Sequence, residues 1–393
     1  MEEKNNMQRQ HDILSITKEF EVHSICAILG PRQCGKTTLA SQYAATLTNM
    51  PIHWFDLENP DDLFALDNPL TTLSELSGLI IIDEIQKRPN LFPILRVLAD
   101  KKQAKYLILG SASRELIKQS SETLAGRVGY IELSPFHLRE VCETEKLLQR
   151  GGFPRSYLAD NEEQSARWRK TYISTFLEQD IPALGFDIPP LMLRRTWMML
   201  THMHGQLLNM EALAKSLGIS GQTVRRYIDI LAGTFMIRLL APWHENLKKR
   251  QVKTPKLYFR DSGILLSLVS IETQSALINY PQRGSIWEGF ALEQIVRALQ
   301  LASEEIFFWR THQGAELDLL IHQDGKRIGF ECTFSDHPQI TKSMRQAMMD
   351  LKLSHLYIAY PGERVVEMEK NITAIGLKSE NAMEVMRTHM KKQ

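Results

Sequence analysis

The sequence predicts an α/β protein made of three consecutive parts. Strand and helix patterns alternate over residues 1–135, which is typical of a parallel sheet with helices on both faces. A glycine-rich loop stands between the first strand and the first helix of this part. The middle of the chain has mostly helical patterns, and alternating strand patterns return from about residue 255. A length of 393 residues is enough for two or three domains.

Short apolar runs predict the strands of the first part, and they lie at residues 24–30, 53–57, 78–84 and 104–111. A helix is expected from Lys36 to about Leu47, directly after the glycine-rich loop. In the last part, the segments FFWR, ELDLLI, RIGFECTF and HLYIAY are strand candidates, and a helix is expected near 338–353.

Composition indicates a soluble cytoplasmic protein. The net charge is +1, so no whole-chain field favours nucleic acid or a membrane surface. The four cysteines are widely spaced and form no CxxC pair, which fits a reducing compartment rather than a disulfide framework or a zinc site. The N-terminal residues are polar, and apolar runs such as Leu79–Ile82 are too short to span a bilayer. We therefore expect no membrane partner.

The loop GPRQCGKT matches the pattern G-x-x-x-x-G-K-[ST], and it follows a strand and opens a helix. Its backbone amides and the helix N-terminus favour an anion such as a phosphate group. Lys36 is expected to reach the β- and γ-phosphates of ATP, and the Thr37 hydroxyl to ligate Mg²⁺. The residues predicted to contact the nucleotide are Gly30, Pro31, Arg32, Gln33, Cys34, Gly35, Lys36, Thr37 and Thr38.

An acidic pair ends the strand at residues 78–84. Asp83 is placed to hold Mg²⁺, and Glu84 to polarise the attacking water as a general base. A buried acidic pair requires a cation nearby, because burial would otherwise neutralise it. The sequence therefore predicts binding of ATP and Mg²⁺, with hydrolysis.

Two further residues are candidates for the reaction. Ser111 ends the next strand, where it would sense the γ-phosphate, or it caps the helix expected at RELIKQS. Arg127 would stabilise the charge that develops at the γ-phosphate, either within the chain or in a neighbouring subunit. The alternative for Arg127 is a surface arginine near the start of a strand.

Several segments occur in the order seen in one family of prokaryotic ATPases. They are GPRQCGKTTLA, IIIDEIQKRPNLFPILR, LILGSAS, LAGRVGYIELSPF, GGFPRSYL, TFLEQDI, YFRDSGI, IWEGF, AELDLLI and GFECTFS. From about residue 20 to 360, the chain resembles bacterial and archaeal AAA-type ATPases with a C-terminal domain of unknown function. The resemblance departs at Gln179-Asp180, where the family usually has Arg-Asp.

The resemblance implies an AAA-type P-loop core at 1–135 and a helical lid or linker at 136–200. A winged-helix module is expected at 201–250. A restriction-endonuclease-like α/β domain, of the PD-(D/E)XK type, is expected at 251–393.

The middle module reads as helix, glycine turn and helix, which is the helix-turn-helix pattern. Ser220 is expected to cap the second helix, whose start would contact duplex DNA. The basic segment LKKRQVKTPKLYFR follows and could touch phosphates. The nucleic-acid candidates are Arg225, Arg226, Lys248, Lys249 and Arg250, with Gln222, Thr223, Lys253, Lys256 and Arg260 beside them. The alternative is an interdomain spacer with a solvated charge run.

Glu288, Asp318 and Glu331 come in the order of the metal ligands of PD-(D/E)XK nucleases and are a possible second metal site. Thr333 stands where an active nuclease has lysine, and Lys342 is a speculative replacement. A degenerate domain is therefore favoured over an active nuclease. Asp261 is expected to cap a local helix.

Three functions remain open at this point: an ATP-driven switch acting on DNA, an ATP-controlled scaffold for a protein partner, and an ATP-regulated nuclease. A nucleotide-dependent homo-oligomer is compatible with each of them.

Overall fold

The computed structural model describes residues 9–112, 124, 126–244 and 254–391. The chain divides into two compact units. The first contains residues 1–135, 174–190 and 228–236, and the second contains 136–173, 191–227 and 237–393. The four domain ranges predicted from the sequence stay a prediction. Within the described residues, no helix is long and apolar enough to cross a membrane.

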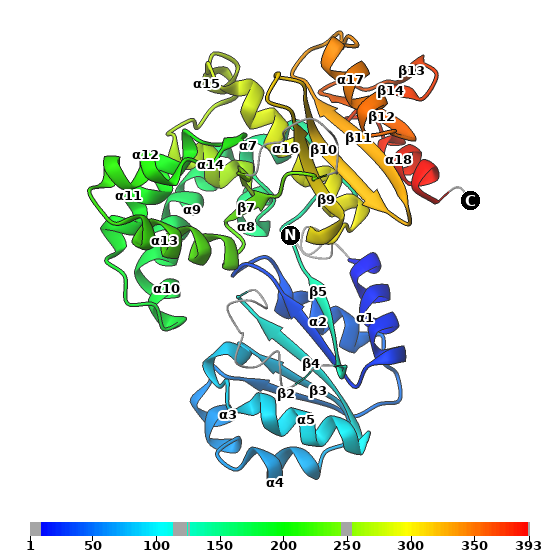
Figure 1. The fold of residues 1–393 in the computed structure, drawn as a ribbon. Coiled ribbons are helices and arrows are strands. Elements are labelled where there is room, and N and C mark those ends of the chain that lie inside the picture. The colour runs from blue at the N-terminus through cyan, green and yellow to red at the C-terminus, as the bar shows by residue number, and fades with distance from the viewer. Residues whose placement is uncertain (1–8, 113–123, 125, 245–253, 392–393) are drawn as a thin grey trace. The chain divides into compact units, whose positions relative to one another are not determined.

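The first unit is built on a five-stranded parallel sheet with the strand order β2-β3-β4-β1-β5 (Figure 1). Its strands are β1 (Ile25–Leu29), β2 (Ile52–Asp56), β3 (Gly78–Asp83), β4 (Ala104–Gly110) and β5 (Val128–Glu132). The predicted strands are therefore confirmed to within about two residues. Strand β1 lies between β4 and β5, so the loop that follows β1 emerges beside the carboxyl end of β4.

Helices cover both faces of this sheet, as the alternation of strands and helices predicts. Helices α1 (Gln10–Val22) and α2 (Lys36–Ala45) pack on one face through a cluster that includes Phe20, Leu39 and Ile28. Helix α5 (Leu91–Lys101) packs on the other face, where Leu95 meets Ile80. Short helices α3 (Pro60–Ala65) and α4 (Pro69–Ser74) lie on the α5 side. Successive strand residues point to opposite faces, which explains why β1 is apolar throughout and β3 is apolar up to its terminal Asp83.

Residues 174–190 also belong to the first unit. Helix α9 (Glu162–Thr175) ends there and continues into a single π-helical turn, Phe176–Asp180, followed by α10 (Ile181–Ala183). Single π-helical turns inside helices are rare and occur often at functional sites.

The second unit begins with α7 (Thr144–Arg150) and α8 (Pro154–Tyr157). Its middle part contains α11 (Pro190–Thr201), β6 (Gln206–Leu207), α12 (Met210–Leu217), the first half of α13 (Gly221–Gly233), β7 (Ile237–Leu240) and β8 (Lys256–Phe259). The residues of α13 from 228 onward belong to the first unit. The three strands form an antiparallel sheet with β8 in the centre. The segment thus has the helix pair that the sequence predicts, together with a small sheet.

The C-terminal part is a six-stranded mixed sheet in the order β13-β14-β12-β11-β10-β9. Its strands are β9 (Ile306–Arg310), β10 (Glu316–Gln323), β11 (Lys326–Cys332), β12 (His355–Tyr360), β13 (Val365–Glu369) and β14 (Ile372–Gly376). Its helices are α14 (Ser262–Leu268), α15 (Gln274–Ile278), α16 (Arg283–Leu299), α17 (Lys342–Asp350) and α18 (Ala382–Lys391). Helix α16 is buried along most of its length, so this part has a core of its own.

Candidate nucleotide site and a second charged centre

The glycine-rich loop joins the carboxyl end of β1 to the first turn of α2. Gly35 has a φ angle of 102°, which a side chain would strain, and a Cβ on Gly30 would lie 2.1 Å from the Leu133 carbonyl oxygen. The ammonium of Lys36 donates to the carbonyl oxygens of Gly30 and Pro31, each at 3.0 Å. The loop therefore wraps around the side chain of Lys36, and the N-terminus of α2 follows directly after the loop.

The next residue reaches the neighbouring acidic strand. The Thr37 hydroxyl donates to the Asp83 carboxylate at 2.7 Å. Burial raises the pKa of Asp83, and the hydrogen bond from Thr37 partly offsets this. A hydroxyl and a carboxylate are hard oxygen ligands, and a buried carboxylate gains from a cation, so these two groups fit Mg²⁺.

Glu84 follows directly in a left-handed conformation, with a φ angle of 54°. A non-glycine residue in this region is uncommon and is found at constrained sites. The carboxylate of Glu84 accepts from the Gln86 side-chain amide and, at 3.4 Å, from the Ser111 hydroxyl. Gln86 also donates to Ser111 at 2.9 Å. The structure thus brings two predicted residues together, and Gln86 is an addition that no motif indicated.

Arg32 lies in the glycine-rich loop and contacts a group of carboxylates. Its guanidinium is paired with Asp180 of the π-helical turn and with Glu58, and its Nε lies 3.9 Å from Glu84. Lys87 adds a second cation to Glu58 at 3.1 Å. Asp180 is 4% exposed, and burial raises its pKa against the effect of Arg32. No sequence pattern indicated a partner for Asp180, and the loop arginine is that partner.

The other loop residues differ in exposure. Pro31 and Cys34 are buried, and the thiol of Cys34 contacts the Leu133 carbonyl oxygen at 3.6 Å. Gln33 and Thr38 are exposed. Ser113 and the expected helix RELIKQS lie outside the described residues.

Arg127 is not brought to this site within the chain. It precedes β5, and its carbonyl oxygen accepts from the amide of Ile25 at the start of β1. Because β1 and β5 are parallel, Arg127 lies at the amino edge of the sheet, whereas the loop follows the carboxyl edge. Its side chain is paired with Asp100 at 2.7 Å on the surface. The expectation that Arg127 acts within its own chain is therefore wrong, and a role in a neighbouring subunit stays a prediction.

Acidic side chains of the C-terminal part gather around one buried lysine. Glu288 lies on α16, Asp318 on β10 and Glu331 on β11, as predicted. The ammonium of Lys256 on β8 lies 3.1 Å from Glu288 and 3.5 Å from Asp318, and it is also paired with Glu316. Burial lowers the pKa of Lys256, but the surrounding carboxylates outweigh this and raise it. We call this set of five side chains the acidic centre.

The structure corrects the prediction that two residues of the basic run, Lys256 and Arg260, are exposed to a nucleic acid. Lys256 was expected in an exposed basic run, but it is 3% exposed and faces carboxylates rather than a nucleic acid. Arg260, from the same run, is buried and paired with Glu293. Lys342 is exposed at the first turn of α17, and no structural observation supports its folding back toward Glu331.

The helix pair of the middle part has the predicted cap. The Ser220 hydroxyl accepts from the Thr223 amide at 3.1 Å at the start of α13. Gln222, Arg225 and Arg226 are exposed on this helix. The other predicted basic residues lie outside the described residues, namely Lys248, Lys249, Arg250 and Lys253.

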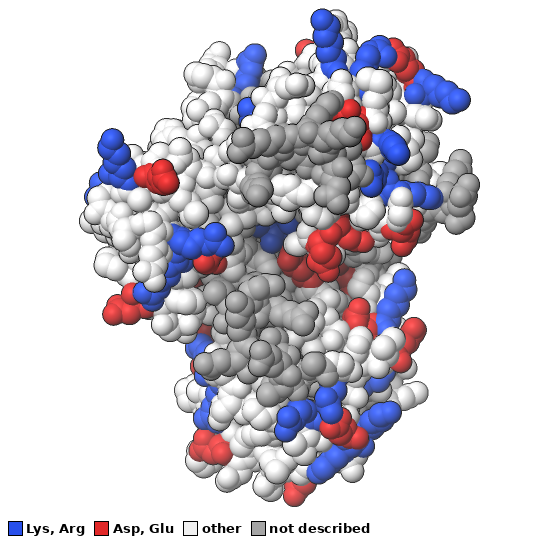
Figure 2. Space-filling view, in the orientation of Figure 1, with Lys and Arg blue, Asp and Glu red and all other residues white. Residues whose placement is uncertain are grey.

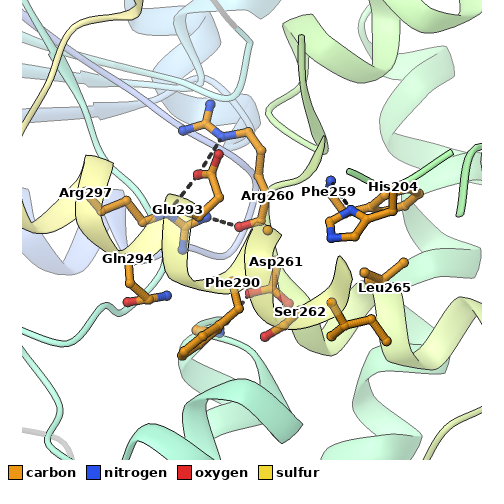
Figure 3. Close-up of a pocket in the computed structure, with 13 residues that line it drawn as sticks. His204, Phe259, Arg260, Asp261, Ser262, Leu265, Phe290, Glu293, Gln294 and Arg297 are labelled. Carbon is orange, nitrogen blue, oxygen red and sulfur yellow. Dashed lines mark hydrogen bonds and ion pairs between the residues drawn. The ribbon is translucent and has the colours of Figure 1, made fainter. Parts of the chain in front are cut away.

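A second charge cluster surrounds Glu293 on α16. Its carboxylate lies 3.5 Å from Arg260 and 3.4 Å from Arg297 (Figure 3). It is also paired with Arg238. The cavity beside these groups has a volume of about 10 Å³, which is room for about one water molecule. This cluster therefore serves as a buried ion network, and Asp261 nearby caps α14 as predicted, by accepting from the Ile264 amide at 2.9 Å.

The parallel sheet, the glycine-rich loop and the acidic strand end define a P-loop ATPase of the AAA type. The family described as "AAA domain" matches residues 22–142. Two domains of unknown function follow, DUF8612 at residues 143–275 and DUF4143 at residues 283–379.

Two curated mycobacterial proteins are similar along most of the chain. They are the uncharacterized proteins Rv2008c of Mycobacterium tuberculosis and Mb2031c of Mycobacterium bovis. Each is 46% identical over 355 residues, which cover 89% of this chain and 79% of the relative. The chain belongs to their family of AAA-type ATPases with a C-terminal domain of unknown function.

Three solved structures match part of this chain at low sequence identity. The Walker-type ATPase PABY2304 of Pyrococcus abyssi is 14% identical with a TM-score of 0.48, over 67% of this chain and 96% of that chain. The Orc1 protein of Aeropyrum pernix, solved in complex with DNA, is 12% identical with a TM-score of 0.33, over 67% and 91%. A point mutant of RuvB from Thermotoga maritima is 20% identical with a TM-score of 0.30, over 61% and 89%.

Proposed function

We propose that this protein binds Mg²⁺ and ATP at the glycine-rich loop and hydrolyses the γ-phosphate. The observation that carries the proposal is the hydrogen bond between Thr37 and Asp83 at 2.7 Å, which joins the two predicted Mg²⁺ ligands from the start of helix α2 and the end of strand β3. Mg²⁺, when bound, neutralises phosphate charge and favours departure of the leaving group.

The chain's own residues have separate tasks in this proposal. Lys36 leaves the loop carbonyl oxygens that it now contacts and pairs with the β- and γ-phosphates. Glu84 takes the proton of the attacking water, because its carboxylate stands at the strand end beside Asp83. Ser111 and Gln86 hold that carboxylate in place before ATP binds. Arg32 holds the carboxylates of Asp180 and Glu58 next to the phosphate site.

The test is phosphate release from ATP by the full chain in the presence of Mg²⁺, measured for a matched pair of variants. Thr37→Ser keeps the hydroxyl and is expected to keep turnover. Thr37→Val has a similar shape but cannot ligate Mg²⁺ or donate to Asp83, so its turnover is expected to be lost. Equal turnover in both variants would contradict the proposal.

We also propose that the ATPase acts on duplex DNA through a winged-helix module formed by α11–α13 and the sheet β6-β8-β7. The capped start of α13 and its exposed Gln222, Arg225 and Arg226 support contacts with phosphates and base edges. On the face seen in Figure 2, positive and negative side chains lie interspersed over much of the surface, so contact with DNA would be local.

Turnover measured with and without duplex DNA separates this proposal from the scaffold alternative. Stimulation by DNA supports a DNA-linked switch, whereas unchanged turnover together with stimulation by a protein partner favours a scaffold. Mass determination with and without nucleotide tests whether subunits assemble so that Arg127 can reach a neighbour's site.

A further inference from the structure

The acidic centre of the C-terminal part contains a cation that belongs to the chain. Three carboxylates from α16 and β10 contact the ammonium of Lys256, which is 3% exposed. Glu331 on β11 lies near enough to interact with this ammonium electrostatically. Lys256 comes from β8, which belongs to the separate antiparallel sheet of the middle part. A buried ammonium is costly unless carboxylates pair with it, and here Glu288, Glu316 and Asp318 do so.

The lysine uses the oxygen atoms that a divalent metal ion would need. Its ammonium contacts Oε1 of Glu288 and Oδ1 of Asp318, at 3.1 and 3.5 Å. The second oxygen of Asp318 accepts from the Cys332 amide at 2.9 Å, so both its oxygens are engaged. A Mg²⁺ ion bound to the same two oxygens at about 2.1 Å would stand next to the ammonium, and the two cations would repel each other.

A second protein donor occupies the Glu288 carboxylate. Tyr258, two residues beyond Lys256 on the same buried strand, also donates to Glu288. Oε1 of Glu288 therefore accepts hydrogen bonds from both Lys256 and Tyr258.

We propose that Lys256 is the resident cation of the acidic centre and takes the place of a divalent metal ion. The C-terminal domain is then not a metal-dependent nuclease. Instead, the ion pairs of Lys256 with Glu288 and Asp318 hold β8 against α16 and β10. A direct consequence is that removal of the ammonium turns the centre into a site for a divalent cation.

The experiment uses the full chain without nucleotide and Mn²⁺ as the probe, with bound Mn²⁺ counted by electron paramagnetic resonance. Lys256→Gln is expected to bind one more Mn²⁺ per chain than the wild type. The gain is expected to vanish in Lys256→Gln combined with Asp318→Asn, and to be absent in Lys256→Arg, which keeps the positive charge. Lys370→Gln is the control, because Lys370 is an exposed lysine of the same part.

Two results would overturn the proposal. One is the absence of a gain in a folded Lys256→Gln variant. The other is a wild-type protein that already binds Mn²⁺ in a manner lost in Asp318→Asn. If Lys256→Gln does not fold without metal, wild type and Asp318→Asn are compared instead. Equal Mn²⁺ binding by these two proteins supports the proposal, and weaker binding by Asp318→Asn contradicts it.

Discussion

Thr37 donates a 2.7 Å hydrogen bond to Asp83, although 46 positions separate the two residues along the chain. The contact follows from the strand order, because β1 and β3 both pair with β4 and all three strands run in the same direction. Residues that follow these strands therefore gather at one edge of the sheet. The hydroxyl and the carboxylate thus lie side by side, as the proposed Mg²⁺ site requires.

Glu84→Gln is expected to separate binding from turnover. The amide keeps the shape of the side chain but cannot take a proton from water, so turnover should fall by roughly 10²- to 10⁴-fold. Affinity for ATP should stay unchanged, because Glu84 has no assigned phosphate contact. Steady-state phosphate release and nucleotide titration measure the two effects. The exposed Glu75→Gln serves as the control, and a variant at Glu84 with full turnover would remove this residue from the mechanism.

Arg32→Ala is expected to destabilise the first unit. Asp180 is 4% exposed, and without the guanidinium its buried carboxylate loses a charged partner, at a cost of about 1–3 kcal/mol. Asp180→Asn in the same chain should recover much of this loss, because it removes the unpaired charge. Urea unfolding of the single and double variants measures the coupling. Arg96→Ala is the control, since Arg96 is an exposed arginine on α5 of the same unit and should change stability little.

Glu293 is expected to make stability depend on acid pH. Burial raises the pKa of Glu293, but Arg238, Arg260 and Arg297 outweigh this and lower it from 4.5 to about 2. Because the pKa of Glu293 is lower in the folded protein than in the unfolded chain, its ionised carboxylate stabilises the folded protein. This stabilisation is complete above about pH 5, and it is lost as the pH falls from 4.5 toward 2. The contribution is on the order of 3 kcal/mol.

Unfolding of wild type and Glu293→Gln across this pH range tests the assignment. The wild type should be more stable at neutral pH, and the difference should shrink as pH falls through 4.5. Glu145→Gln, which removes one partner of an exposed pair with Lys378, should show a much smaller trend, because solvent screens that pair. A difference that stays constant with pH would show that Glu293 does not carry the charge we assign to it.

The pair Arg225→Ala and Arg226→Ala is expected to weaken binding to duplex DNA uniformly across sequences. If both arginines contact phosphates, the slope of log affinity against log salt should drop by about 2. Fluorescence anisotropy at several salt concentrations measures the slope. Arg167→Ala, an exposed arginine on α9, should leave it unchanged. Binding of the wild type that does not respond to salt would exclude this surface.

Much of the nucleotide site was predictable, because its residues lie in two short local motifs next to strands. The sequence predicted Lys36, Thr37, Asp83 and Glu84 at one edge of a parallel sheet, and the structure places them there. One prediction from the sequence placed Arg127 near the γ-phosphate of the same chain, although its position before a strand indicated the opposite edge of the sheet. A residue that precedes a parallel strand lies at the edge opposite to one that follows a strand.

The partners of buried charges could not be read from the sequence. Lys256 stands in a run of basic residues, which suggests a solvated surface, and its partner Asp318 lies 62 positions away. Arg32 likewise meets Asp180 from 148 positions away. Such pairs depend on how separate elements pack, and no local pattern of charge or hydrophobicity reports that packing.

Calorimetric titration of the full chain with ATP and Mg²⁺ tests the central claim most directly. The account predicts saturable binding of one nucleotide per chain. The Lys36→Ala variant should lose affinity by roughly 10- to 100-fold, because it lacks the charge-assisted bonds to the phosphates. Lys101→Ala, an exposed lysine on α5 of the same unit, should bind as the wild type does. Absence of binding by the wild type, or equal affinity in wild type and Lys36→Ala, would contradict the account.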